Sequence, residues 1–262
     1  MEATVRFVEM VNSPARDIDL VEGALLLAAH ADPEFDLVAE TARVDDLAAQ
    51  CSEPTLEGIC RLLFDDLGFA GDSDDYYDPA NSLLDRVIER RRGLPITLSL
   101  LTIEIGKRVG VPLDGVGMPG HFLVRDGALT NVFVDPFSGG TSLSAAECEV
   151  LFHRTVGPDV VFDPAYLEPV TGGSILCRMA ANLVNAYRQK GDRHGMRWSA
   201  RLRSRCPGVD PAEQVQLGQA LGYSGAFDEA AALLEDAAEY MPSDSASRAV
   251  RLKASQFQAR LN

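Results

Sequence analysis

One histidine and one aspartate in the middle of the chain have the residue types of a catalytic pair. His121 and Asp135 lie in the stretch GMPGHFLVRDGALTNVFVDPFSGG, residues 117–140. An imidazole oriented by a carboxylate can take a proton from a serine or cysteine nucleophile, which is the chemistry of a catalytic triad. The same carboxylate can also simply satisfy one ring nitrogen of a buried histidine. Whether a third, attacking group exists therefore decides between the two interpretations.

The segments that carry the pair alternate between two faces, as β-strands do. HFLVR and TNVFV are joined by DGAL, which predicts an antiparallel hairpin. A turn centred on Ala128 would place His121 opposite Asp135, with Cβ atoms about 5 Å apart. A two-residue turn at Asp126 and Gly127 would instead leave Asp135 beyond the pairing. We expect the first register, and we expect both faces to be covered because both carry apolar residues.

An apolar helix is predicted directly before these strands, in LPITLSLLTIEIGKRVGVP. Pro95 suits a first helical position, because no partner is needed there for the N–H that proline lacks. Apolar residues point nearly all round this helix, which is typical of a buried helix and places it against the sheet. Gly110 and Pro112 end it. Thr97 and Ser99 lie in its first turns.

The order of these elements resembles the core of transglutaminase-like proteins, in which a buried helix precedes one strand with histidine and another with aspartate. NSLLDRVIERRRGLPITLSLLTIEIGKRVGVPLDGVGMPGHFLVR and VDPFSGG, followed by helical repeats, are most similar to a bacterial family described as regulating SirC expression. That family joins a transglutaminase-like domain to C-terminal tetratricopeptide (TPR) repeats. The resemblance covers roughly residues 20–245. It implies an α+β, mostly helical fold with a papain-like core and a small antiparallel sheet.

The resemblance also implies roles for individual residues. His121 matches the triad histidine and Asp135 its orienting carboxylate, while the nucleophilic cysteine falls on Pro95 or within one residue of it. A cysteine at a helix N-terminus is activated by the helix dipole, but proline has no attacking group. No cysteine lies between Cys60 and Cys148. We therefore expect a pseudoenzyme that serves protein–protein interaction or regulation.

Two alternatives remain open at this point. Thr97, the better placed by position, or Ser99 could complete a hydroxyl triad with His121 and Asp135, as could a displaced cysteine. The protein would then be a hydrolase or acyl transferase. Against this, hydroxyls in buried helices usually bond to the carbonyl of the preceding turn. The pair could also line a ligand or peptide pocket, whose candidate binding residues are Asn81, Arg91, Arg92 and Gly120.

The chain is expected to divide into residues 1–169, which begin with helices, and residues 170–262, which are helical throughout. In the second part Leu183, Tyr187 and Gly191 are matched by Leu217, Leu221 and Gly225, each 34 positions later, which is the period of TPR repeats. One and a half repeats are too few to stand alone, so they are expected to lean on the first domain. Three arginines spaced four apart are candidate binding residues on one helix: Arg193, Arg197 and Arg201.

Charge differs sharply between the two parts. Residues 1–169 carry 12 Lys/Arg and 30 Asp/Glu, whereas residues 170–262 carry 12 and 9. The acidic part should repel nucleic acid, so the expected partner is a protein. The basic helix could be a solvated face, could dock on the acidic domain, or could bind an acidic partner or nucleic acid.

The remaining features predict a cytoplasmic protein without a cofactor or metal. The five cysteines are scattered, without the Cys/His spacing of a zinc site. The N-terminus does not resemble a secretion signal, and no apolar run is long enough to span a membrane. Reduced thiols fit such a compartment.

Overall fold

The buried helix that precedes the strands has the bounds expected from its sequence. Helix α6 (Pro95–Val109) starts with Pro95 in its first turn. It stops where Gly110 takes a left-handed φ of 79°, a conformation that glycine adopts without steric cost. Every residue from Pro95 to Gly106 is buried. The prediction of a helix apolar on all sides and enclosed by the protein is therefore confirmed.

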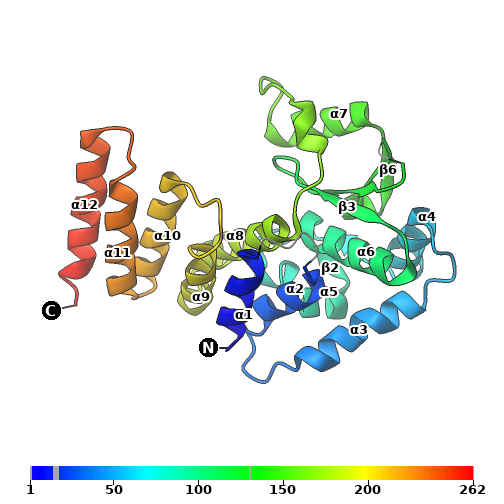
Figure 1. Ribbon diagram of the computed structural model, residues 1–262, viewed down its shortest axis with the longest axis horizontal. Coiled ribbons are helices and arrows are strands. Elements are labelled where there is room, and N and C mark those ends of the chain that lie inside the picture. Colours follow the sequence, from blue (N-terminus) through cyan, green and yellow to red (C-terminus); the bar gives the residue numbers. More distant parts are fainter. Residues whose placement is uncertain (1, 14–17, 130, 262) are drawn as a thin grey trace. The chain divides into compact units, whose positions relative to one another are not determined.

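The computed structural model describes residues 2–13, 18–129 and 131–261, which fall into two compact units (Figure 1). One unit comprises residues 14–179, and the other comprises residues 1–13 together with 180–262. A single boundary after residue 169 was predicted, before helix α8 (Gly172–Lys190). The structural division instead falls within that helix.

Helices surround α6 in the unit of residues 14–179. They are α2 (Leu20–Ala28), α3 (Leu37–Ala49), α4 (Leu56–Cys60) and α5 (Leu84–Arg90). Side chains of Asp19, Asp36 and Thr55 accept hydrogen bonds from the first-turn N–H groups of α2, α3 and α4. Such caps satisfy donors that have no partner within the helix. Helices α2 to α5 all contact α6.

A four-stranded antiparallel sheet follows α6 in the chain. Its strands are β3 (Leu113–Val116), β4 (Leu123–Asp126), β5 (Phe133–Asp135) and β6 (Thr141–Leu143), paired in that order. The small antiparallel sheet is therefore confirmed, with an added strand on each side of the predicted hairpin. Two further strands, β1 (Ala70–Gly71) and β2 (Arg92–Gly93), pair in parallel just before α6.

The predicted register of the hairpin is wrong. Val124 pairs with Val134 and Arg125 with Phe133, so β4 begins two residues after His121. The reason lies in the turn, where the Asp126 carboxylate accepts hydrogen bonds from two backbone N–H groups and holds a wider loop. The predicted second strand also includes Thr130, which lies outside the described residues.

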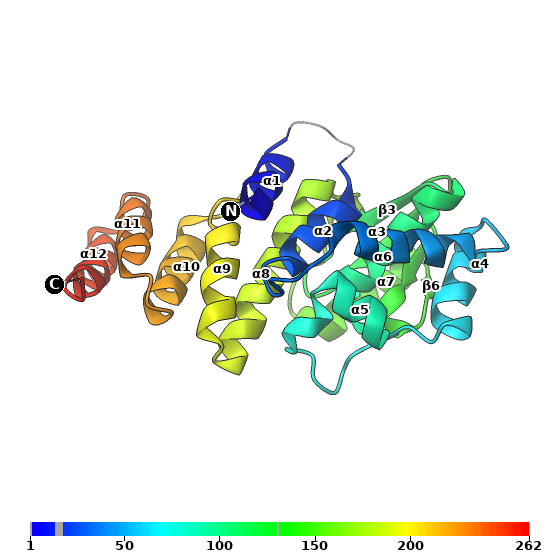
Figure 2. The same ribbon diagram turned by 90° about the horizontal axis from the view of Figure 1, so that it is seen from below.

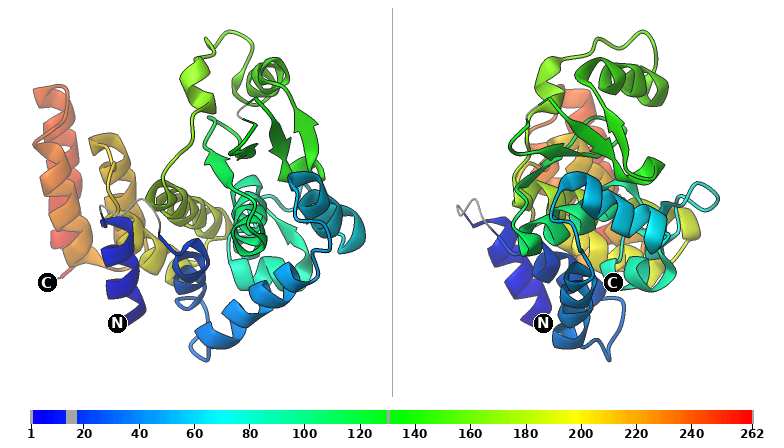
Figure 3. Two further views of the ribbon diagram at one scale, coloured as in Figure 1. Left: turned by 45° about the vertical axis from the view of Figure 1, so that its right-hand side comes forward. Right: turned by 90° about the vertical axis from the view of Figure 1, so that its right-hand side faces the viewer.

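The shift by two residues leaves the sheet faces unchanged, because strand side chains alternate with a period of two. Leu123 and Phe133 pack with Cys148, Leu151 and Phe152 of helix α7 (Ala145–Val156). Helix α6 contacts β3 and β4, and it lies on the side of the sheet opposite α7 (Figures 1 and 3). Coverage of both faces is confirmed.

The unit formed by residues 1–13 and 180–262 is entirely helical in its described residues. Besides α1 (Glu2–Val11) and the C-terminal part of α8, it contains α9 (Arg193–Arg203), α10 (Pro211–Tyr223), α11 (Phe227–Ala238) and α12 (Asp244–Gln258). Helices α9 to α12 each pack against the next in the chain (Figure 2). Within the part of the chain that the structure describes, no helix has the length and apolarity needed to cross a membrane.

Candidate functional site

His121 and Asp135 meet, although not as cross-strand neighbours. The Nε2 atom of His121 lies 2.9 Å from Oδ1 of Asp135, and the two residues are 7% and 3% exposed. Asp135 ends β5, whereas His121 lies in the connection that precedes β4. The contact therefore joins the end of β5 to the segment that leads into β4, its neighbour in the sheet.

Asp135 is held as an anion by a set of donors. Its carboxylate also accepts hydrogen bonds from the backbone N–H of Phe137 at 3.0 Å and from the Ser138 hydroxyl at 2.7 Å. Burial alone would raise the pKa of Asp135, but the His121 and Ser138 bonds and the histidine charge outweigh it, and the pKa is lowered. Because an ionised carboxylate only accepts, Nε2 of His121 is the donor in this pair.

This arrangement leaves Nδ1 of His121 as the nitrogen that could accept a proton. No hydrogen bond joins Nδ1 to any residue in the part of the chain that the structure describes. The backbone N–H of His121 donates to Met118 at 3.1 Å, which fixes the turn that carries the ring. An imidazole that donates through one nitrogen to a carboxylate and presents the other is arranged as a general base.

The start of α6 presents no free hydroxyl to this ring. Pro95 is buried at the first turn, where the resemblance places the nucleophile. The Thr97 hydroxyl, fully buried, donates to the carbonyl of Asn81 at 3.0 Å, and the Ser99 hydroxyl lies 3.5 Å from the carbonyl of Phe122. The Ser99 contact brings the first turns of α6 beside the backbone next to His121.

Two cysteines of the same unit are poor nucleophiles. Cys148 is fully buried under the sheet, and burial, with smaller effects of the Glu147 and Asp135 charges, raises its pKa to about 11. Burial and neighbouring acids raise the pKa of Cys60 to about 12. Only the thiolate attacks, so both groups are almost wholly inactive at neutral pH.

The other predicted binding residues of this unit have structural partners. Asn81 is fully buried, and its carbonyl accepts from the Leu94 N–H at 3.1 Å as well as from Thr97. Arg91 caps α5 in a left-handed conformation and donates to the Leu67 carbonyl at 2.7 Å.

Gly120 and Arg92 are the remaining two candidates. Gly120 has a φ of 76°, and a Cβ at this position would lie 3.0 Å from the Thr155 hydroxyl, so only glycine fits without strain. Arg92 is exposed in β2, and its guanidinium reaches the carbonyl of Arg91 at 3.4 Å.

Residues missed by the sequence analysis form part of the surroundings of His121. The Phe137 ring lies 6.1 Å from the His121 ring and 6.1 Å from the Tyr76 ring, measured between centroids. Tyr76 lies in the acidic segment between β1 and α5. Arg178 donates to the carbonyls of Met118 and His121 at 3.1 and 2.8 Å. The available signal was a single arginine, Arg178, within the mainly apolar run SILCRMAANLV.

The predicted basic stripe of the helical unit is partly neutralised within that unit. Arg201 forms an ion pair with Glu229 in α11, and Arg197 donates to the carbonyl of Ser224. Arg193, at the start of α9, is exposed.

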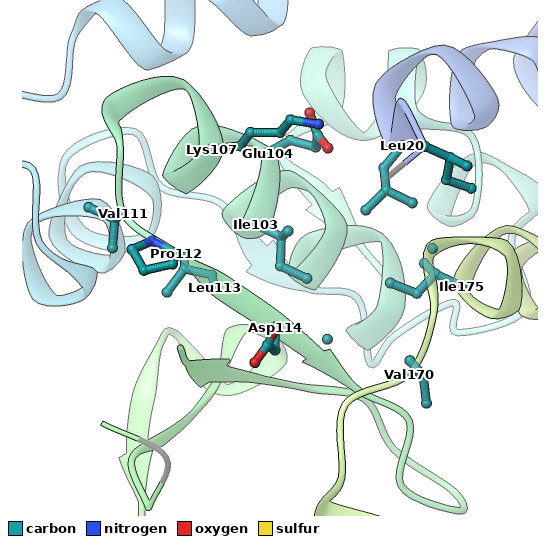
Figure 4. A pocket seen from close by; sticks show the side chains of 13 residues that line it. Leu20, Ile103, Glu104, Lys107, Val111, Pro112, Leu113, Asp114, Val170 and Ile175 are labelled. Carbon is teal, nitrogen blue, oxygen red and sulfur yellow. The ribbon is translucent and has the colours of Figure 1, made fainter. Parts of the chain in front are cut away.

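The unit of residues 14–179 has one cavity that reaches the His121–Asp135 pair and another that does not. One of about 370 Å³ reaches Asp135 and is lined by Ser138, Leu143, Glu147 and Arg154 among others. Another, about 390 Å³, lies between α2, α6, β3 and the start of α8, and His121 does not line it (Figure 4). No group of three or more His, Cys, Asp or Glu in the described residues could hold a metal ion.

Comparison with known proteins shows similarity to one superfamily and to a group of bacterial relatives. Residues 29–181 match the transglutaminase-like superfamily. A UPF0162 protein of Xylella fastidiosa (strain 9a5c) is 39% identical over 186 residues, which are 65% of this chain and 65% of that protein. A UPF0162 protein of Vibrio cholerae is 30% identical over 192 residues, 68% of this chain and 70% of its own length.

A eukaryotic protein shares the same region. F-box only protein 21 of Homo sapiens is 30% identical over 210 residues, 71% of this chain but 32% of its own length. The chain thus spans slightly less than two thirds of the Xylella relative and about one third of the human one. No solved structure matches the chain.

Proposed function

The chain belongs to the transglutaminase-like superfamily and to the family of UPF0162 proteins, and on that premise we propose that residues 14–179 form a binding module without catalysis. The site of the superfamily is retained in it as a recognition site. Its histidine and carboxylate, His121 and Asp135, are bonded to each other at 2.9 Å, and the neighbouring Ser138 hydroxyl donates to Asp135 rather than to the imidazole.

The main support for this proposal is the position of Pro95. It occupies the first turn of α6, where the resemblance to transglutaminase-like proteins requires the nucleophile. One turn further on, Ser99 contacts the carbonyl of Phe122, next to His121 in the chain. The contact supports a position of the first turns of α6 close to His121, with a proline ring in place of a thiol.

Other groups that could attack are engaged or insulated. The Thr97 hydroxyl already donates to Asn81, and donation of its proton to His121 would require breaking that bond in a buried site. Cys148, with a pKa of about 11, lies under the opposite face of the sheet among apolar side chains. These contacts support a role in binding over a role in group transfer.

The helical unit is proposed to supply the surface for a protein partner through TPR-like helix pairs, in a regulatory role in the cytoplasm. Gly191 and Gly225, 34 residues apart, both take positive φ angles at the turns after α8 and α10. Leu183 and Leu217, also 34 apart, are both buried. This equivalence supports two copies of one helical repeat. Docking of the basic helix α9 on an acidic surface would then rely mainly on Arg193, because Arg201 is already paired.

Mass spectrometry of the intact protein tests the absence of catalysis. We expect no covalent adduct on the full chain during incubation with activated esters and with glutamine-containing peptides, and no product above the uncatalysed rate. An adduct mapped to α6 or to any cysteine, lost when His121 is replaced by glutamine, would refute the proposal.

The second candidate is a hydrolase or acyl transferase that uses Thr97, Ser99 or a displaced cysteine. The observation in its favour is the open Nδ1 of His121, which keeps the orientation of a general base. Product formation that disappears in Thr97→Ala but persists in Ser99→Ala would assign the attack to Thr97, and the reverse would assign it to Ser99.

A further inference from the structure

Arg178 differs from the other partly buried arginines of its unit. Four arginines between residues 18 and 179 share its intermediate exposure, and each forms an ion pair with a carboxylate: Arg43, Arg86, Arg108 and Arg125. Arg178 has no such pair within the described residues. A partly buried cation without a counter-anion is costly, and it attracts an anion if one can reach it.

The guanidinium of Arg178 has donors to spare. Both of its hydrogen bonds, to the carbonyls of Met118 and His121, come from Nη2. Nε and Nη1 have no acceptor in the part of the chain that the structure describes. Nη1 of Arg178 lies beside Gly117, and a Cβ added to Gly117 would be 3.5 Å from it. Because glycine has no side chain, Gly117 does not cover Nη1. The centroid of the Phe122 ring is 5.5 Å from the guanidinium carbon.

Aromatic ring contacts lead from Tyr76 through Phe137 to the imidazole of His121. Tyr76 is 39% exposed, and its ring stands edge-on to Phe137, which in turn stands edge-on to His121. The Phe137 ring packs directly over Gly71. A Cβ added to Gly71 would lie only 2.5 Å from this ring. Burial raises the pKa of Tyr76, and the nearby Arg178 charge opposes that rise. The phenol is therefore a neutral donor at about pH 7.

We propose that Arg178, His121 and Tyr76 form a binding site for a carboxylate group. The guanidinium supplies the charge, the phenol of Tyr76 supplies a neutral donor, and the imidazole borders the site through Nδ1. Planar guanidinium and carboxylate groups match in two-point hydrogen bonding. This inference rests on the proposed function, since it names the ligand class that a non-catalytic site beside His121 would recognise.

One cation and one neutral donor suit a single negative charge better than a doubly charged phosphate. Asp135 strengthens this preference, because its ionised carboxylate lies 2.9 Å from the imidazole and repels additional negative charge. The carboxylate can be the C-terminus of a peptide or an acidic side chain, and both offer the same chemistry.

The test follows the imidazole resonances of the full chain in solution, with the His121 signal assigned from its loss in His121→Gln. The probes are N-acetylglycine for a chain terminus, N-acetylglutamate α-amide for a side chain, N-acetylglycinamide as neutral analogue, and inorganic phosphate. We expect saturable shifts of the His121 signal with at least one carboxylate probe, none with the neutral analogue, and weaker binding of phosphate. The stronger carboxylate probe identifies the source of the group.

Variants then assign the binding to the guanidinium. Arg178→Gln should weaken carboxylate binding by about tenfold or more, and the matched Arg125→Gln, which removes an arginine already paired with Asp114, should leave it unchanged. If Arg178→Gln does not fold, Tyr76→Phe decides, since loss of one hydroxyl from a residue that is 39% exposed should weaken binding several-fold without unfolding the protein.

Three results would overturn the assignment: equal binding of N-acetylglycinamide and carboxylates, tighter binding of phosphate, or full affinity in folded Arg178→Gln or Tyr76→Phe. This experiment measures equilibrium binding without an acyl donor. A covalent adduct in the mass-spectrometric test would therefore refute the absence of catalysis while leaving the carboxylate site standing, and failure to bind carboxylates would do the reverse.

Discussion

At the scale of single residues, Asp135 and Thr97 have their hydrogen-bonding needs met by the protein itself. Asp135 accepts from His121, Phe137 and Ser138, and Thr97 donates to Asn81. A site arranged for group transfer instead leaves its attacking atom poised toward its base. Two groups keep unused hydrogen-bonding capacity beside this cluster, namely Nδ1 of His121 and the guanidinium of Arg178.

Replacing Asp135 by asparagine should destabilise the protein in a pH-dependent way. The folded state lowers the pKa of Asp135, so its contribution to stability is complete above the ordinary carboxyl pKa and is lost as the pH falls through the lowered value. We expect Asp135→Asn to cost about 1–3 kcal/mol at about pH 7 and much less at about pH 3. Urea unfolding at both pH values measures this difference.

The matched control for that measurement is Asp159→Asn, at an exposed position of the same unit. Its effect should stay within about 0.5 kcal/mol at both pH values. A cost for Asp135→Asn that does not change with pH would show that the carboxylate charge plays no part in holding His121.

At the scale of elements, the sequence predicts the bounds of helices whose ends are marked by proline or glycine. It does not predict the strand register or the contacts that side chains make across long separations in the chain. Pro95 and Gly110 mark the two ends of α6, and both bounds are found as expected. The hairpin register was wrong because Asp126 caps its own loop, a local choice that alternating apolar residues do not encode. Tyr76 and Arg178 approach His121 from segments far away in the chain, so no spacing rule could identify them.

The start of α6 should depend on Asn81. Its side chain donates to the Asp75 carbonyl at 2.9 Å, which fixes the backbone carbonyl that receives Leu94 and Thr97. Because Asn81 is fully buried, Asn81→Ala should lower the free energy of unfolding by about 1–3 kcal/mol. Chemical denaturation measures this loss. Asn131→Ala, at an exposed position, should have almost no effect, and equal losses in both variants would contradict the assigned role.

At the scale of the whole molecule, the first helix belongs to the same unit as the last ones. Residues 1–13 group with residues 180–262, and Asn12 donates to the carbonyl of Arg205 at 3.1 Å. The N-terminal segment thus takes part in the helical unit, which a division of the chain by sequence order alone would miss. The short repeat region, expected from sequence to need support, gains an additional helix in this way.

Truncation of a core residue in α1 should therefore loosen the helical unit selectively. Phe7 is fully buried, and Phe7→Ala should cost about 3–5 kcal/mol in that unit. Hydrogen exchange should report faster exchange in α9 and α10, with the strands β3 to β6 unchanged. Val5→Ala, at a half-exposed position of the same helix, serves as the control. Loss of protection in the sheet rather than in α9 would contradict the division into units.

On the proposed function, the imidazole of His121 faces the start of α6, where only the attacking group is missing. Alkylation of Pro95→Cys at neutral pH, followed residue by residue with mass spectrometry, tests this arrangement. We expect the introduced thiol to react about tenfold or more faster than the same thiol in the double variant Pro95→Cys and His121→Gln. The thiol of Ser99→Cys, one turn away, should show no such dependence on His121. Equal alkylation rates of the Pro95→Cys thiol with and without His121 would contradict the claim.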